Sequence, residues 1–248
     1  MKIALIGDVH ANLPALEAVL DQAYQEGAEE IWNCGDFVGY NAFPEEVVRK
    51  LRTEKVVSVV GNYDLKVIKF PRKNQKWKKS KSLEKWLAFK WAYEHLSEES
   101  LQYLSSLPEK RRMKCEEKTV LLVHGSPDSS KEHLYADTPT ERLVELADIA
   151  AADLVVCGHS HQSFVRYVAG TWFINSGSVG RPDDGDPRAT YAILELAGDS
   201  IDVRHFRVSY DVVAAITEIR RRGLPTAFGE MMRKGRKLDW ILREAGSV

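Results

Sequence analysis

Residues 3–10 read Ile-Ala-Leu-Ile-Gly-Asp-Val-His, a short apolar run that ends abruptly in glycine and aspartate. Four consecutive apolar residues are typical of a strand that is buried on both faces of a parallel sheet. After Asn12, a suitable helix cap, apolar side chains recur at helical spacing as far as Gly27, with Pro14 in the first turn. A buried strand followed directly by a helix predicts the first unit of an α/β fold.

The same unit recurs along the chain. Apolar runs at 31–34, 56–60, 120–123, 154–157 and 171–174 each end in a short polar turn. Helices are predicted over about 45–51, 140–151 and 211–222, and an antiparallel strand pair over 189–196 and 200–208. The tail after Pro225 is predicted to be helical and peripheral. This alternation indicates an α/β fold with a largely parallel central sheet.

Residues 66–108 interrupt the alternation and predict a small helical insert beside or over the sheet edge. Its first part, Lys66 to Lys85, holds nine basic residues and one acidic residue and is interpreted as a loop. Its second part, about 83–107, has the apolar spacing of two helices. The basic run is either a solvated face or an electropositive approach to a site, and Trp77 and Trp86 either stack on a base or pack in the core. We predict one domain over residues 1–248 that includes this insert.

The composition excludes several classes of protein. Lys plus Arg is 35 and Asp plus Glu is 36, so the net charge of −1 favours no polyanionic partner. Cys34, Cys115 and Cys157 are too widely spaced for a disulfide framework, and Cys34 and Cys157 are predicted to be buried thiols. No apolar run approaches the roughly 18 residues of a membrane span, and no signal peptide is evident. These features predict a cytoplasmic protein.

Candidate metal ligands stand where the predicted strands end. The carboxyl ends of parallel strands meet at one edge of a sheet, so side chains that are distant in sequence can converge there. A mixed set of oxygen and imidazole ligands without sulfur suits manganese, iron, zinc, nickel or cobalt better than magnesium or calcium alone. Two ions about 3.5–4 Å apart need a carboxylate between them and can clamp a phosphoryl group. The candidates are Asp8, His10, Asp36, Asn62, His124, His159 and His161.

Together these turns resemble the signature blocks of the calcineurin-like metallophosphoesterases, in that family's order. The blocks are Gly-Asp8-Val-His10, Gly-Asp36-Phe-Val-Gly, Gly-Asn62-Tyr-Asp64, Val-His124-Gly and Gly-His159-Ser-His161. Residues 175–180, Asn-Ser-Gly-Ser-Val-Gly, resemble a further block of small bacterial and archaeal members. The resemblance covers about residues 3–180. It implies a four-layer sandwich of two facing mixed β-sheets flanked by helices.

The resemblance also assigns roles. Asp8, His10, Asp36 and His161 would hold the first of two divalent metal ions, with manganese the first choice. Asp36 would bridge to the second ion, which Asn62, His124 and His159 would complete. A hydroxide between the ions would be the nucleophile, because two cations lower the pKa of bound water. The expected reaction is hydrolysis of a phosphate ester or phosphoanhydride, by a phosphodiesterase or phosphatase. The expected substrates are small, such as nucleotides, cyclic nucleotides or dinucleoside polyphosphates.

The third block departs from the family pattern. The family usually has a histidine, thought to stabilise the transition state or protonate the leaving oxygen, where this sequence has Tyr63. A tyrosine, with a reference pKa of about 10, is a poor acid near neutral pH. We therefore predict that Tyr63 weakens catalysis on poor leaving groups more than on activated aryl esters or anhydrides. Asp36, Asn62, Tyr63 and Asp64 are the catalytic candidates, although Asp64 loses its usual partner.

Substrate contacts and the remaining histidines leave alternatives open. Arg181 and Arg188 flank an aspartate-rich loop, so they either bind a phosphate or pair with those aspartates. His95 and His205 are predicted to be structural or solvent-facing, whereas His133 could reach the rim of the site. Two other functions are alternatives to hydrolysis of a small phosphate ester. A binding scaffold would keep the fold without activity, and a nuclease would need a continuous basic groove that is not evident here.

Overall fold

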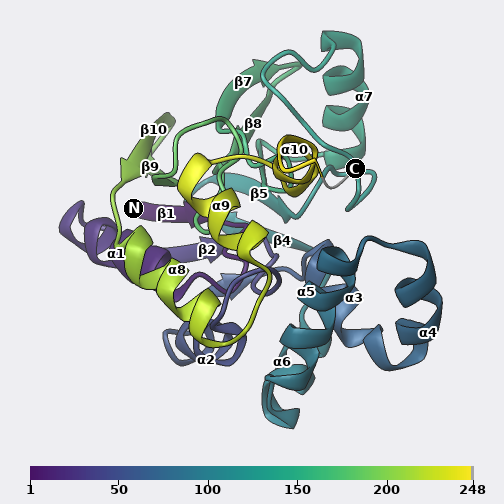
Figure 1. Cartoon of the computed structure of the whole chain (residues 1–248). Helices are drawn as coiled ribbons and strands as arrows, with labels where there is room; N and C mark the ends of the chain where they lie inside the picture. Colours follow the sequence, from purple (N-terminus) through teal and green to yellow (C-terminus); the bar gives the residue numbers. More distant parts are fainter. Residues whose placement is uncertain (247–248) are drawn as a thin grey trace.

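The first of two five-stranded sheets is built around the N-terminal strand. The computed structural model describes residues 1–246 (Figure 1). Strand β1 pairs in parallel with β2 and antiparallel with β9, so the sheet is mixed. The strand order is β10-β9-β1-β2-β3. The strands are β1 (Lys2–Ile6), β2 (Glu30–Asn33), β3 (Val57–Ser58), β9 (Ala189–Ala197) and β10 (Ser200–Val208).

The second sheet comes from the middle of the chain and has the order β4-β5-β6-β8-β7. Its three inner strands are parallel, and each edge strand is antiparallel to its neighbour. The strands are β4 (Lys110–Cys115), β5 (Lys118–Val123), β6 (Leu154–Cys157), β7 (Phe164–Val168) and β8 (Thr171–Asn175).

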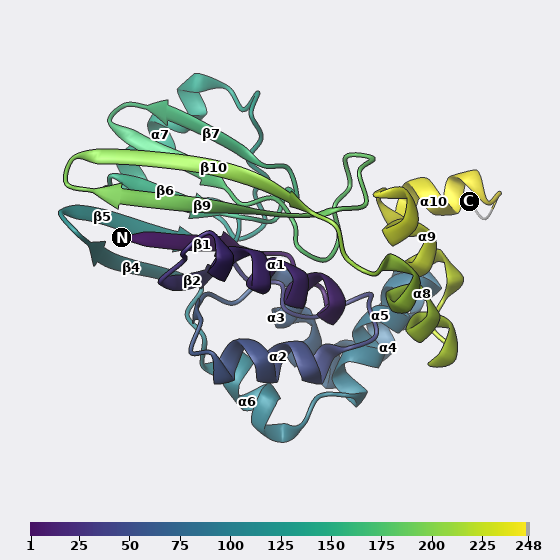
Figure 2. The same cartoon turned by 90° about the vertical axis from the view of Figure 1, so that its left-hand side faces the viewer.

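Alternation of side chains along the strands produces four layers. On β1, Ile3 and Leu5 pack in a core between the two sheets, whereas Ala4 and Ile6 face the helices on the other side. Helices α1 (Leu13–Gln25) and α2 (Pro44–Thr53) complete the helical core, and α7 (Thr140–Ala150) covers the outer face of the second sheet. The order of helices, sheet, sheet and helix, visible in Figure 2, confirms the predicted four-layer sandwich.

The insert is more helical than the sequence indicated. It contains α3 (Asn62–Ile68), α4 (Phe70–Ser80), α5 (Leu83–Glu94) and α6 (Glu98–Ser106). The two later helices confirm the prediction, but the loop predicted over the basic run was wrong. Lysine and arginine favour helices and Pro71 suits a first turn, so the sequence supports α4 locally. Trp77 of α4 packs on Phe89 of α5, with ring centroids 5.4 Å apart.

Two strands, β4 and β7, were not predicted from the sequence, and both lie at the edges of the second sheet. Charged side chains dominate β4, and β7 is half-exposed, so neither shows a buried apolar run. Such composition is typical of edge strands. At the edge of the first sheet, β3 is two residues long rather than the five predicted, because the Val60 N–H bonds to the Pro108 carbonyl instead of a strand.

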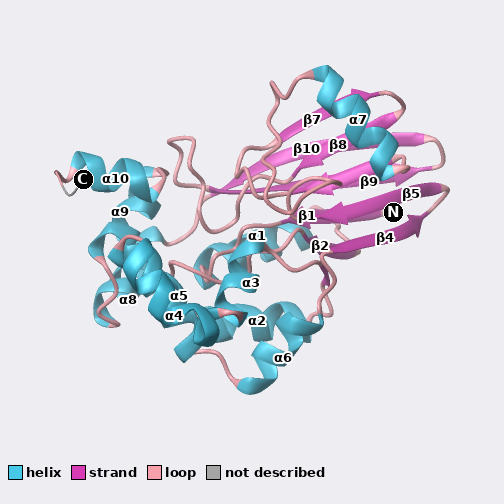
Figure 3. Ribbon diagram, turned by 90° about the vertical axis from the view of Figure 1, so that its right-hand side faces the viewer, coloured by secondary structure: helices cyan, strands magenta, loops and turns pink. Residues whose placement is uncertain are grey.

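The C-terminal helices turn back over the carboxyl ends of the strands. They are α8 (Val212–Arg221), α9 (Thr226–Lys234) and α10 (Leu238–Glu244). Figures 2 and 3 place α9 and α10 beyond the ends of the sheets rather than against a sheet face. The prediction of a helical tail is confirmed, and apolar residues of these helices pack with Tyr40 and Ala88 in a cluster apart from the sheets. Among residues 1–246, none of the helices combines the length and the apolar character that crossing a membrane requires.

Candidate metal centre and active site

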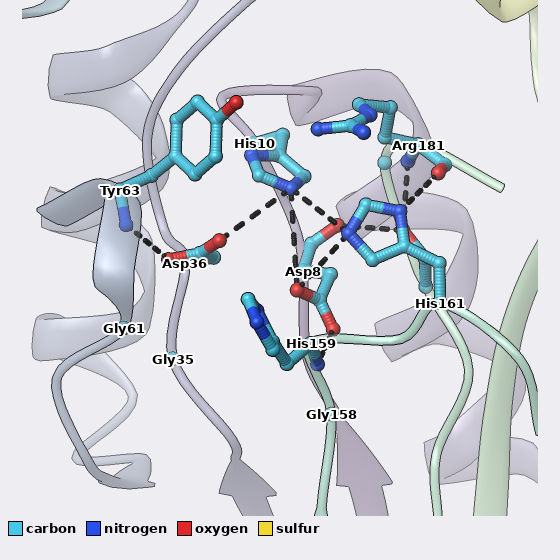
Figure 4. Close-up of polar contacts among 12 residues, drawn as sticks. Asp8, His10, Gly35, Asp36, Gly61, Tyr63, Gly158, His159, His161 and Arg181 are labelled. Atoms are coloured by element: carbon cyan, nitrogen blue, oxygen red, sulfur yellow. Dashed lines mark hydrogen bonds and ion pairs between the residues drawn. The ribbon is translucent and has the colours of Figure 1, made fainter. Parts of the chain in front are cut away.

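Five of the seven candidate ligands have a strained backbone conformation. Asp8, His10, Asp36, His159 and His161 have φ angles of 52°, 47°, 57°, 65° and 61°. Non-glycine residues seldom adopt this left-handed conformation, and when they do the strain is concentrated at functional sites. Each of these residues follows a strand, so the chain turns sharply there and points the side chain across the ends of the sheets (Figure 4).

One cluster joins Asp8, His10 and His161. The Nε2 atoms of His10 and His161 are 3.3 Å apart, and the His161 Nε2 is also 3.3 Å from Asp8 Oδ1. All three side chains are buried, and their ligand atoms lie within 4.8 Å of one another. This spacing would allow one ion to contact all three residues.

A second cluster joins Asp8, Asp36 and His124, again within 4.8 Å. Asp36 Oδ2 lies 3.5 Å from His124 Nε2 and 3.7 Å from His10 Nε2. The Asp36 carboxylate therefore stands between a histidine of each cluster. This is the place expected of a bridging ligand.

Backbone carbonyls orient the buried imidazoles. The Nδ1 atoms of His10, His124 and His161 face the carbonyls of Val38, Cys34 and Arg181 at 3.3, 2.8 and 2.7 Å. A carbonyl only accepts hydrogen bonds, so each Nδ1 carries the proton and each Nε2 keeps a lone pair. All three lone pairs therefore face the cluster of carboxylates.

The residues present fit divalent cations. Among residues 1–246, the buried Asp8 Oδ1 and His124 Nε2 have no hydrogen-bond partner, and buried polar atoms normally have one. The His10 and His161 lone pairs face each other at 3.3 Å with no proton to share. A cation in each cluster would give all four atoms a partner.

The electrostatics of the clusters agree with this fit. Burial, together with the nearby Asp8 charge, raises the pKa of Asp36 to about 7. Burial also opposes ionisation of Asp8, but attraction to His161 prevails and lowers its pKa below the ordinary value. Burial lowers the pKa of His159 to about 3 and that of His10 well below its ordinary value, so both imidazoles are neutral. Neutral imidazoles are the form that binds metals, and a bound cation would offset the repulsion between the Asp8 and Asp36 carboxylates.

Asn62 and His159 lie beside the second cluster and contact each other. The Asn62 amide nitrogen is 2.9 Å from His159 Nδ1, and the His159 and His124 rings are 4.7 Å apart. His133 stacks on His159 with ring centroids 3.9 Å apart. His133 therefore reaches the rim of the site, which the sequence left open as an alternative.

The Asp64 side chain forms hydrogen bonds with backbone groups and does not line the cavity. Its Oδ2 accepts hydrogen bonds from the Asp36 and Gly61 N–H groups at 3.0 and 2.9 Å, and its Oδ1 accepts one from Val38 at 3.2 Å. A Cβ at Gly61 would lie 2.1 Å from the Asp36 nitrogen, so only glycine permits this approach. The geometry makes Asp64 a positioning residue for Asp36.

Residues 175–180 brace the Asp8 turn from the other side. The Ser178 hydroxyl donates to the Asp8 carbonyl at 2.9 Å, and the Gly180 N–H donates to the same oxygen at 3.0 Å. A Cβ at Gly180 would lie 1.8 Å from the Val9 carbonyl oxygen. This segment therefore fixes the turn that carries Asp8 and His10.

Tyr63 packs beside the ligands with a second tyrosine. Its ring meets His10 edge-on at 5.1 Å, and its hydroxyl is hydrogen-bonded to that of Tyr40. The Arg181 guanidinium lies over the Tyr40 ring at 4.6 Å. Burial raises the pKa of Tyr63 well above its usual value, so the hydroxyl stays protonated.

A cavity of about 360 Å³ opens above the clusters, and many of the side chains that line it are basic. Five basic residues from distant segments line it, whereas the acidic residues in its wall are Asp36 and Asp239. Of the predicted phosphate-binding arginines, Arg181 lines the cavity, whereas Arg188 does not and pairs with Asp186 at 2.6 Å. The basic residues are Lys66, Lys85, Lys131, Arg181 and Lys237.

The other histidines and cysteines lie where the sequence placed them. The His205 Nε2–H donates a hydrogen bond to the Asn175 carbonyl at 2.7 Å, and the His95 ring stacks on Trp91. Cys34 and Cys157 are fully buried in apolar clusters. The sequence reading missed Lys131 and residues 237–239 because no local pattern marks them as parts of the site.

Comparison with known proteins is consistent with this geometry. Residues 1–199 match the model of the calcineurin-like phosphoesterase superfamily domain. A metallophosphoesterase from Sphaerobacter thermophilus is 34% identical, with a TM-score of 0.75 over 95% of this chain and 99% of that one. A hypothetical protein from Pyrococcus horikoshii shares the fold, with a TM-score of 0.86 at 22% identity over 95% and 99% of the two chains. Phosphodiesterase YfcE of Escherichia coli is 25% identical over 79% of this chain and 88% of its own.

Proposed function

The chain belongs to the calcineurin-like phosphoesterase superfamily and is a phosphoester hydrolase. From this premise we propose that it uses two divalent transition-metal ions, with manganese the first choice, to hydrolyse a small nucleotide-like phosphodiester or phosphoanhydride. The observation that carries the proposal is the position of Asp36. Its Oδ2 lies 3.7 Å from His10 Nε2 and 3.5 Å from His124 Nε2, between two groups of unsatisfied ligand atoms.

The ligand sets follow from this position. Asp8, His10, Asp36 and His161 would hold one ion. Asp36, Asn62, His124 and His159 would hold the other, with Asp8 close enough to contribute to both groups. Ions bound there would lower the pKa of a water molecule and offset the negative charge that develops on phosphorus.

The residues around the metal centre would position the substrate. Arg181 lines the cavity, and its buried Nε has no hydrogen-bond partner among residues 1–246, so its guanidinium is available to a phosphoryl oxygen. Tyr63 would donate at most a hydrogen bond, because burial raises its pKa. Without a general acid at this position, a leaving group must depart without protonation. Aryl oxides and phosphates meet that condition better than alkoxides.

The charge of the cavity supports a substrate with more than one negative group. Lys66 and Lys131 line the cavity together with Arg181. Cations that converge on one opening raise the local concentration of anions. The observations therefore favour a nucleotide or a phosphoanhydride over a substrate with a single charge.

We also propose that the chain is one domain that includes the insert. Phe89 of α5 and Leu104 of α6 belong to the same apolar cluster as Ala4 of β1 and Leu16 of α1. A shared core supports folding as one unit. Residues 247–248 lie outside the described residues.

The test is hydrolysis of bis-p-nitrophenyl phosphate beside p-nitrophenyl phosphate, with purified metal-free protein and added manganese. We expect turnover that requires the metal, with the diester cleaved faster, and loss of turnover in Asp36→Asn. A matched control, Asp148→Asn on the exposed surface of α7, should retain full activity. Absence of turnover with every divalent transition metal, on both esters and on a nucleoside diphosphate, would contradict the proposal.

A further inference from the structure

A second cavity of about 510 Å³ adjoins the metal cavity. The two cavities share Lys237 and Asp239 in their walls. The C-terminal segment supplies most of the second cavity, beyond the residues 1–199 that match the family model, so family membership assigns it no role. Figure 3 shows α9 and α10 beyond the strand ends. The lining residues are Asp183, Arg236, Lys237, Asp239, Trp240 and Arg243.

Ion pairs neutralise the wall between the cavities. Lys237 Nζ lies 3.4 Å from Asp183 Oδ2, and Lys85 Nζ lies 2.6 Å from Asp239 Oδ1. These pairs tie the C-terminal segment to the loop after β8 and to α5. Both acidic residues of the second cavity therefore already have a partner.

The two arginines of the second cavity have no such partner. Among residues 1–246, neither Arg236 nor Arg243 forms an ion pair, whereas Arg142 contacts three carboxylates. Both are exposed. The Arg236 guanidinium lies 5.8 Å from the centre of the Trp240 ring. It also lies so close to Gly185 that a Cβ there would be 2.9 Å from its Nη2. Glycine at this position therefore leaves room for the arginine.

This combination of groups has a chemical preference. An unpaired guanidinium recognises phosphate oxygens through two parallel hydrogen bonds. An indole ring provides a face on which a planar base can stack. Two guanidinium groups beside an indole therefore suit a nucleoside phosphate.

We propose that this second cavity binds the distal nucleoside phosphate of an elongated substrate whose scissile phosphate lies in the metal cavity. The inference rests on the proposed function and specifies its substrate class. Residues Lys237 and Asp239 lie along the path that such a molecule would take between the cavities.

The kinetic test compares a long and a short substrate on the metal-loaded enzyme. We expect Arg236→Ala/Arg243→Ala to raise KM for diadenosine tetraphosphate by about tenfold or more, with kcat unchanged. KM for bis-p-nitrophenyl phosphate, which has no second nucleoside phosphate, should stay within about twofold. Arg220→Ala/Arg233→Ala, which removes two exposed arginines of α8 and α9 that line neither cavity, controls for the lost charge. Equal changes for both substrates, or none for either, would overturn the inference.

A binding measurement separates this inference from the proposed function. Calorimetry with a methylene-bridged, non-hydrolysable diadenosine tetraphosphate reports affinity whether or not the enzyme turns over. Trp240→Ala should weaken the binding of this dinucleotide and leave the affinity for inorganic tripolyphosphate unchanged, because tripolyphosphate has no base to stack on the indole. Wild-type affinity for the dinucleotide in both the arginine and the tryptophan variants would refute the inference. Loss of turnover on all substrates with binding intact would refute only the proposed function.

Discussion

The floor and the rim of the site are built in opposite ways. On the floor, Asp8, His10 and Asp36 are buried, held by backbone hydrogen bonds and fixed in left-handed turns at the strand ends. On the rim, Lys131 and Lys237 are exposed and come from a loop and from the C-terminal segment. The candidate metal ligands are therefore specified by local sequence, whereas the residues that would select a substrate come from segments that only the tertiary fold brings together.

Removing a ligand from the floor should produce the largest effect. We expect His124→Ala to reduce kcat by about 10³-fold, because it removes a candidate ligand of one ion. His205→Ala is the matched control, since His205 is also held by a backbone carbonyl but lies outside the site. Steady-state kinetics on bis-p-nitrophenyl phosphate measure both variants. A similar loss in both would show that the floor has no special role.

The floor also depends on a residue that touches no substrate. We expect Asp64→Asn to weaken metal binding by about 10- to 100-fold, because an amide cannot accept all three backbone hydrogen bonds that position the Asp36 turn. Calorimetric titration of manganese into metal-free protein measures the affinity. Unchanged affinity in a folded Asp64→Asn variant would count against a positioning role, and Asp148→Asn should behave as wild type.

Tyr63 lies beside the candidate ligand His10 and also lines the cavity. Its replacement should change the rates of cleavage of different substrates unequally. We expect Tyr63→His to accelerate cleavage of alkyl esters by about tenfold or more, because histidine can protonate a poor leaving group near neutral pH. Rates on p-nitrophenyl esters should change little. The measurement is the dependence of kcat/KM on the pKa of the leaving group. An equal change for every leaving group would contradict this account of Tyr63.

Removing positive charge from the basic helix α4 should have the smallest effect on activity. We expect Lys76→Ala/Lys79→Ala to lower kcat/KM for an anionic nucleotide by no more than about threefold, because exposed charges act only by long-range attraction. The difference should disappear in high salt. Lys55→Ala/Lys114→Ala removes the same charge from the opposite end of the sheets, and we expect no change. A loss that persists at high salt would indicate direct contact with the substrate.

The sequence predicted the floor because its determinants are local. A buried apolar run, a glycine and a polar side chain occupy a few consecutive residues, as in Gly7-Asp8 and Gly35-Asp36. The order of these turns also indicated the family and, with it, the two facing sheets. The structure then brought Asp8, Asp36 and His124 within 4.8 Å of one another.

The rest could not be predicted from sequence because it depends on tertiary contacts. The charged strand β4 becomes a strand only by pairing with β5. Lysines that could belong to a solvated loop form α4 once Trp77 packs on Phe89. The role of Asp64 depends on a turn 28 residues earlier in the chain. Lys237 reaches the cavity because the C-terminal segment turns back over the strand ends.

The central claim is that Asp36 joins two metal sites, and the metal stoichiometry tests it most directly. Titration of metal-free protein with manganese, followed by calorimetry, should give two equivalents per chain for the wild type. The His124→Ala variant should keep one tight equivalent, held by Asp8, His10 and His161. A single equivalent in the wild type, or stoichiometric loss of both ions in His124→Ala with the fold intact, would contradict the account.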